Sequence, residues 1–192
     1  MLSSPAHIAF AWVTAPSNAV PALTAEFYCG TRDLFQARLD KMTRLLLSKH
    51  ILPESELYLI AALAGEIGNN SFDHNIGNWS DVPGVFFSYH DGETKKQIIL
   101  ADRGQGILKT LKKVKPSLEN DEQALETAFR EKLSGRAPEN RGNGLKFVLQ
   151  TVQDQKLHLA FSSGSAQAAL NDAMMIKKAD VFIHGCLAVL SF

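Results

Sequence analysis

Three polar side chains at regular spacing form the first pattern in the sequence that could perform chemistry. Glu66, Asn70 and His74 recur every fourth residue, so a helix would place them on one face. Asn69 and Asp73 would lie beside this face. An amide oxygen is a hard ligand suited to Mg²⁺, and a carboxylate one turn earlier can orient or deprotonate an attacking nucleophile. The same spacing also describes the solvated face of an ordinary amphipathic helix, so the pattern alone does not decide between these interpretations.

A second pattern, Asp-x-Gly-x-Gly-Ile, directly follows the apolar run at 98–101. It consists of Asp102, Gly104, Gly106 and Ile107. Glycines allow a ligand to approach the backbone closely, and a carboxylate at a strand end can accept a hydrogen bond from an exocyclic amine such as N6 of adenine. The pattern is neither a Walker A loop nor a dinucleotide fingerprint, because no Gly-Lys-Ser/Thr and no sustained helical periodicity follow it. Taken by itself, it also fits an ordinary turn.

A third pattern precedes an apolar repeat of helical spacing. Arg141, Gly142 and Gly144 lead into Leu145 and Lys146. Glycines at the start of a helix leave backbone N–H groups free at the positive end of the helix dipole, which suits phosphate. Arg141 and Lys146 would add charge-assisted contacts. The alternative interpretation is a common loop-to-helix junction.

The elements that must position these patterns follow from apolar periodicity. Helices are expected at 32–50, 54–75, 121–133 and 144–153. Strands are expected at 24–30, 84–90, 97–101, 157–161 and 181–192. Residues 166–178 fit either a helix or a strand, and residues 1–23 are expected to form an arm or an extra strand. Helices against a mostly antiparallel sheet predict an α+β two-layer sandwich.

The composition narrows the classes of function. The chain has 192 residues, of which 45% are hydrophobic and 21% charged, so one domain with a substantial core is expected. Its 20 basic and 20 acidic residues balance, which argues against a broad basic surface for nucleic acid. No window approaches the ~18 apolar residues of a membrane span. A secretory signal is not expected either, because no basic residue precedes the N-terminal apolar residues and prolines interrupt them.

The two cysteines point to a reducing compartment. Cys29 and Cys186 lie far apart and lack the spacing of a metal site, so free thiols are expected. A cytoplasmic protein is therefore expected.

The order of the three patterns resembles that of the GHKL ATPases. This family spans histidine kinases, bacterial anti-sigma serine kinases, the gyrase B subunit, mismatch-repair ATPases and chaperones of the ninety-kilodalton heat-shock class. Its N, G1 and G2 boxes match Glu-x₃-Asn-x₃-His on a helix, Asp-x-Gly-x-Gly after a strand and Gly-x-Gly-Leu opening a helix. The resemblance covers about residues 25–192. It implies the Bergerat fold, a mostly antiparallel mixed sheet covered by helices on one face, with an ATP-binding domain at 24–192 and a lid at about 108–141.

The resemblance also implies roles for individual residues. Asn70 would hold Mg²⁺ against the phosphates of ATP, and Glu66 would be the general base. Asp102 would bind adenine N6 in a pocket shaped by Gly104 and Gly106, while the backbone at 142–145 would hold phosphates. The other nucleotide contacts expected are Asp73, His74, Ile107, Arg141, Gly142, Gly144, Leu145 and Cys186. The lysines at 109, 112, 113 and 115 lie in the lid region, where a solvated edge is favoured over phosphate contacts for most of them.

One position departs from the family pattern. The last strands of GHKL proteins often carry a Gly-Thr pair whose hydroxyl supports the adenine–aspartate contact through water. In this chain Gly185 is followed by Cys186. A thiol is a poorer hydrogen-bond partner than a hydroxyl, which puts adenine affinity or selectivity in question.

The surroundings of the motifs favour one branch of the family. A phospho-accepting helix pair is not expected within the about 50 residues before the N-box helix, and a transducer domain is not expected after the last strand. The expected activity is γ-phosphoryl transfer from Mg·ATP to a serine or threonine of a partner protein, as in anti-sigma-type kinases. The alternatives are a nucleotide-dependent interaction switch without phosphotransfer and a catalytic module of a two-component system. A homodimer in which the 1–23 segments pair strands between two copies of the chain is a further alternative.

Overall fold

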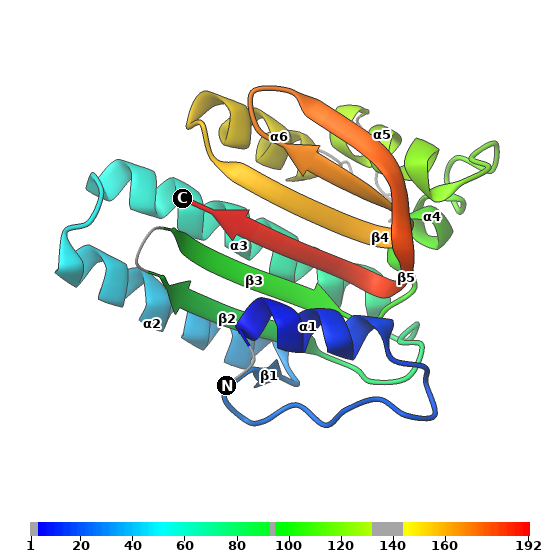
Figure 1. Ribbon diagram of the computed structural model, residues 1–192, viewed down its shortest axis with the longest axis horizontal. Helices are drawn as coiled ribbons and strands as arrows, with labels where there is room; N and C mark the ends of the chain where they lie inside the picture. The colour runs from blue at the N-terminus through cyan, green and yellow to red at the C-terminus, as the bar shows by residue number, and fades with distance from the viewer. Residues whose placement is uncertain (1–3, 93–94, 132–143) are drawn as a thin grey trace.

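One antiparallel sheet organises the molecule. The computed structural model describes residues 4–92, 95–131 and 144–192. The sheet has the order β1-β2-β3-β5-β4, and each neighbouring pair is antiparallel (Figure 1). The strands are β1 (Tyr28–Cys29), β2 (Val85–Asp91), β3 (Lys96–Asp102), β4 (His158–Leu170) and β5 (Met174–Ser191). The expected mostly antiparallel sheet is confirmed, and no parallel pair occurs between the strands that the structure describes.

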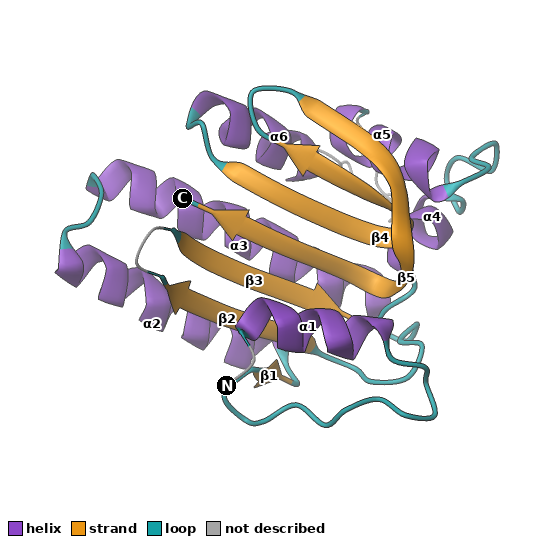
Figure 2. Cartoon of the chain, in the orientation of Figure 1, coloured by secondary structure: helices purple, strands orange, loops and turns teal. Residues whose placement is uncertain are grey.

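Four helices pack on one face of the sheet. They are α2 (Arg32–Lys49), α3 (Glu54–Asn75), α5 (Asp121–Arg130) and α6 (Gly144–Asp154). Their apolar residues form a single core with every second residue of the central strands, such as Ile98 and Leu100 of β3. Figure 2 shows these helices against one side of the sheet. The α+β sandwich predicted from the sequence is confirmed, and α3 has the expected bounds.

The other face of the sheet carries a helix that the sequence interpretation missed. Residues 1–23 were expected to form an arm or an extra strand, but Pro5–Thr14 form helix α1. The Ser4 side chain caps the helix, and Pro5 occupies its first turn, where its missing N–H costs nothing. This proline therefore starts a helix rather than breaking an apolar run.

Helix α1 builds a second, smaller core. Trp12 and Val13 pack against Ile99 and Ala101 of β3 and against Leu187 of β5. Because β3 alternates its side chains between the two faces, it contributes to both cores. The expected helices cover one face, and α1 adds a helix on the other: α1 lies in front of the sheet in Figure 1, with α2 and α3 behind it.

Further boundaries also differ from the sequence interpretation. The ambiguous segment 166–178 contains the end of β4, the turn at 171–173 and the start of β5, because the two strands continue there as an antiparallel pair. The first strand is shorter than 24–30. A short helix, α4 (Gly106–Leu111), begins inside the glycine motif, where only a turn was expected. Of the lid predicted at about 108–141, residues 132–143 lie outside the described residues. Within the described ranges, no helix combines the length and the apolar character that a membrane span requires.

Candidate functional site

A pocket between α3, the end of β3, α6 and β5 brings together residues of all three sequence patterns. Asn70 and His74 come from the first pattern, and Leu145 from the third. The second contributes Asp102, Gly106 and Ile107. The full lining is Ile67, Asn70, Ser71, His74, Asn75, Asp102, Gly106, Ile107, Thr110, Leu145, Phe161 and Cys186. Glu66, Asp73, Gly104 and Gly144 do not line it. The pocket measures about 40 Å³, which is room for one or two water molecules.

Asp102 is the most enclosed polar group of this pocket. It ends β3 and is 2% exposed. Its carboxylate accepts hydrogen bonds from Ser71 Oγ at 2.7 Å and from the Gly104 backbone N–H at 2.8 Å. Burial raises the pKa of Asp102 above its ordinary value, while these hydrogen bonds and those from Cys186 and Asn75 oppose the shift. The site thus holds a desolvated hydrogen-bond acceptor at the end of a strand.

Two residues that hold the Asp102 loop were not singled out from the sequence. Ser71 and Asn75 lie one turn apart on α3 and face β3. Asn75 Oδ1 accepts a hydrogen bond from the Gln105 backbone N–H at 2.9 Å, and Asn75 Nδ2 lies 3.4 Å from Asp102 Oδ1. The end of α3 therefore fixes the glycine loop. The available signal in the sequence was that Ser71 and Asn75 form a polar i,i+4 pair on the same helix as Asn70.

Gly185 permits a close approach of β5 to the end of β3. Its φ is +72°, and a Cβ atom there would lie 2.2 Å from the Asp102 carbonyl oxygen. The next residue, Cys186, has a pKa raised well above its ordinary value, by burial and then by the nearby Asp102 charge. Its thiol therefore stays protonated and acts as a weak hydrogen-bond donor rather than as a nucleophile.

A hydroxyl from β4 lies next to this thiol. Ser163 Oγ is 3.6 Å from Cys186 Sγ. It donates to the Gly185 carbonyl at 2.8 Å and accepts from the Ile107 backbone N–H at 3.0 Å. Ser163 thus joins β5 to the start of α4. The family resemblance implies a hydroxyl at position 186, where this chain has a thiol. Ser163 places a hydroxyl next to that thiol from the neighbouring strand, and the sequence alone did not indicate this pairing.

Glu66 lies beside Asn70 and against the start of α6. Asn70 Nδ2 donates to Glu66 Oε1 at 3.2 Å, which leaves the amide oxygen as the acceptor end of Asn70. A Cβ atom at Gly144 would lie 1.7 Å from Glu66 Oε1, so only glycine fits here without movement. The carboxylate therefore borders the helix terminus that was expected to bind phosphate. Arg141 and Gly142 lie outside the described residues.

Asp73 is directed to a different partner. It forms an ion pair with Arg32 at the start of α2. The contact joins α2 to α3, and it accounts for an acidic residue of α3 that does not line the pocket.

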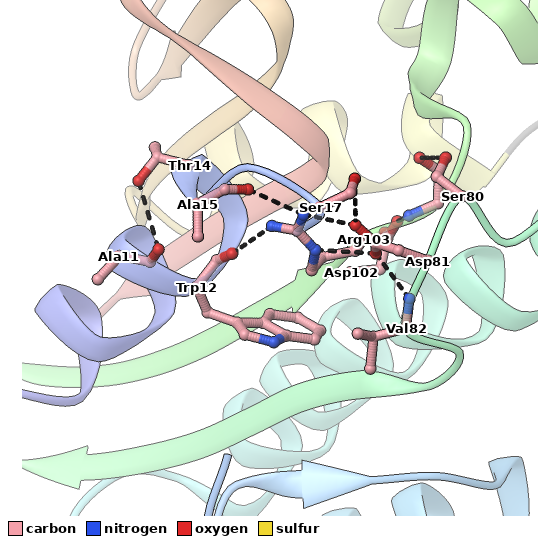
Figure 3. A network of polar contacts seen from close by, with 11 residues as sticks. Ala11, Trp12, Thr14, Ala15, Ser17, Ser80, Asp81, Val82, Asp102 and Arg103 are labelled. Carbon is pink, nitrogen blue, oxygen red and sulfur yellow. Dashed lines mark hydrogen bonds and ion pairs between the residues drawn. The ribbon is translucent and has the colours of Figure 1, made fainter. Parts of the chain in front are cut away.

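A buried arginine anchors the same loop from the opposite face of the sheet. Arg103 is 0% exposed and donates two hydrogen bonds to Asp81, at 2.9 and 2.6 Å. It also donates to the carbonyls of Trp12 and Ala15 at the end of α1, and Ser17 Oγ donates to Asp81 at 2.8 Å. Figure 3 shows the guanidinium between these partners. The network links α1 to the residue between Asp102 and Gly104, and no sequence pattern had indicated it.

The ionisation of Asp81 makes part of the free energy of unfolding depend on pH. Hydrogen bonds from Arg103 are the largest cause that lowers the pKa of Asp81 from 3.8 to about 2. A carboxyl with a lower pKa in the folded state stabilises the fold above its unfolded pKa. This contribution is lost as the pH falls from about 4 through about 2. We expect it to be about 1–2 kcal/mol, because solvent partly screens the pair.

Denaturant unfolding of the wild type and Asp81→Asn checks this expectation. At about pH 6 the variant should be less stable than the wild type by this amount, and near pH 2 the gap should shrink to a small fraction. An equal gap at both pH values would contradict the assigned effect of Asp81.

The oxygen donors of this pocket suit a magnesium ion that takes most of its ligands from water and from a bound small molecule. No cluster of three or more His, Cys, Asp or Glu side chains that could hold a metal occurs among the described residues. Mg²⁺ usually keeps several waters and takes one or two protein oxygens plus phosphates, so the Asn70 amide oxygen fits this role. No family model matches the chain, and no curated protein shows a significant sequence match to it.

Proposed function

We propose that the chain is a GHKL-type ATP-binding domain that takes Mg·ATP between α3, the glycine loop after β3 and the start of α6. The observation that carries this proposal is the pocket that Asn70, Asp102 and Leu145 line together, although they are far apart in the sequence. Three separately ambiguous patterns that meet in one pocket are more specific than any of them alone.

Different pocket residues would bind different parts of Mg·ATP. Asp102 accepts a hydrogen bond from the exocyclic amine of adenine, and Ser71 and Asn75 keep its carboxylate in place. Asn70 supplies an amide oxygen to Mg²⁺, and the first N–H groups of α6 face the phosphates. Bound Mg²⁺ would neutralise charge that develops on the transferred phosphoryl group. Because the pocket measures only about 40 Å³, an adenine ring requires a lining side chain such as Leu145 to move outward.

The proposed reaction is phosphoryl transfer to a serine or threonine of a partner protein. The hydroxyl oxygen forms a bond to the γ-phosphorus, the bond from this phosphorus to the β–γ bridging oxygen breaks, and ADP leaves. Glu66 takes the hydroxyl proton as general base. Its place beside Asn70 supports this role, because the metal ligand and the base then lie one turn apart on the same helix. This activity belongs in the cytoplasm, where Cys29 and Cys186 also stay reduced.

One observation favours a second candidate, a nucleotide-dependent interaction switch without phosphotransfer. The Glu66 carboxylate lies against Gly144, so a nucleotide that enters the phosphate end must separate them. Binding would then rearrange the start of α6 and change the neighbouring surface. The two candidates share the nucleotide site and differ in turnover. A two-component module, the third possibility, would instead transfer phosphate to a histidine and give an acid-labile product.

Asp102→Asn tests the nucleotide site. The substitution keeps the size of the side chain but replaces the ionised acceptor with an amide. We expect ATP affinity to fall by about 10- to 150-fold, which corresponds to the loss of a charge-assisted hydrogen bond of about 1.5–3 kcal/mol. Isothermal titration calorimetry with and without Mg²⁺ measures the change. Circular dichroism establishes that the variant is folded.

Asp172→Asn is the matched control, since Asp172 is exposed in the turn between β4 and β5. It should bind ATP like the wild type. If the wild type binds no ATP at millimolar concentration, or Asp102→Asn binds as tightly as the wild type, the proposed site is wrong.

A further inference from the structure

A second and larger pocket lies beside the same glycine loop. It measures about 430 Å³ and is lined by residues 104–106, by Lys109 of α4 and its C-cap residue Lys112, and by Phe182 and His184 of β5. A cavity of this size is within the range of ligand sites in proteins. Gly106 lines both this pocket and the smaller one, so the glycine loop is a wall between them.

The charges of this pocket favour an acidic ligand. Lys109 lies on α4, and Lys112 caps its C-terminal end in a helical conformation, so the two side chains share one side of this turn, and both residues are exposed. Neither forms an ion pair with any residue that the structure describes. The one carboxylate in the lining, Asp121, accepts a hydrogen bond from the Ser165 backbone N–H at 2.8 Å. The two lysines therefore remain available to a ligand's carboxylates.

An apolar side chain accompanies the two lysines. Phe182 is 54% exposed, and its ring packs edge-on against His184 with centroids 5.2 Å apart. This ring offers apolar contact at the pocket, which suits a polypeptide with apolar side chains better than a small anion.

We infer that this pocket docks an acidic, partly apolar segment of a partner protein. Glutamate or aspartate side chains of the segment pair with Lys109 and Lys112, and an apolar side chain packs on Phe182. The inference rests on the proposed function in one respect: it places the phospho-accepting partner next to the loop that borders the nucleotide. The net charge of zero and the presence of only two lysines in the lining disfavour nucleic acid.

The test uses the full chain and a defined peptide in the absence of nucleotide. The probe is a terminally blocked hexapeptide of alternating glutamate and leucine, titrated to millimolar concentration into ¹⁵N-labelled protein. We expect chemical-shift changes at 104–112 and 182–185. The Lys109→Gln/Lys112→Gln double variant should bind about 3- to 30-fold more weakly, in line with the loss of two exposed ion pairs. The same peptide with glutamine in place of glutamate should show a similar loss.

Lys177→Gln/Lys178→Gln is the matched control, because it removes the same charge from exposed positions of β5 that do not line the pocket. It should bind the peptide like the wild type. Shifts that are absent or scattered over the surface, or an equal loss of affinity in both double variants, would overturn the docking site. ATP calorimetry on the same samples separates this result from a failure of the nucleotide site, since the peptide titration needs no ATP.

Discussion

Replacing Arg103 with methionine is expected to lower the free energy of unfolding by about 3–5 kcal/mol. Methionine keeps an unbranched side chain of similar length but removes every hydrogen bond to Asp81, Trp12 and Ala15. The Asp81 carboxylate would then keep its charge in a largely enclosed position without its partner, and two carbonyls at the end of α1 would lose a donor. The melting temperature should fall by about 6–20 °C in a chain of this size.

An exposed pair provides the comparison for Arg103→Met. Arg130 contacts Glu126 on the surface of α5, with side-chain exposures of 54% and 61%. Arg130→Met should change the free energy of unfolding by less than about 1 kcal/mol. Thermal and denaturant unfolding measure both variants. Similar small losses in the two variants would mean that the Arg103 network does not anchor α1.

Sequence periodicity was sufficient for the elements that carry the main core. Helix α3 was predicted with correct bounds because its apolar residues repeat at helical spacing and Pro53 marks its start. The hairpin of β2 and β3 followed from β-forming residues around Asp91-Gly92. These signals are local, so they do not depend on where the rest of the chain lies.

Features that depend on contacts between distant segments could not be predicted. Pro5 by itself suggests a break in the N-terminal apolar run. It starts a helix because Ser4 caps the first turn and because α1 packs on strands that lie much later in the sequence. Ser163 supplies a hydroxyl to the loop after β3 only because β4 and β5 are paired. Arg103 lies inside the Asp-x-Gly-x-Gly pattern, yet its hydrogen-bond partners are Asp81 and two carbonyls at the end of α1. A charged residue within a glycine-rich pattern can therefore anchor the fold rather than contact a ligand.

Glu66→Gln is expected to separate the two candidate functions. The amide retains the shape of the side chain and an oxygen that can accept from Asn70, so ATP affinity should stay within about threefold of the wild type. It cannot take a proton from the attacking hydroxyl, so phosphoryl transfer should fall by about 10²- to 10⁴-fold. Calorimetry measures the binding, and transfer of radiolabelled γ-phosphate to a partner protein measures the turnover.

Glu54→Gln on the same helix makes the same chemical change at an exposed position outside the pocket and should leave both quantities unchanged. Unchanged turnover in Glu66→Gln would remove Glu66 from the mechanism. A wild type that binds Mg·ATP without phosphorylating a bound partner would instead support the interaction switch. In that case the contact between Glu66 and Gly144 becomes the element to study, because nucleotide entry must open it whether or not phosphate is transferred.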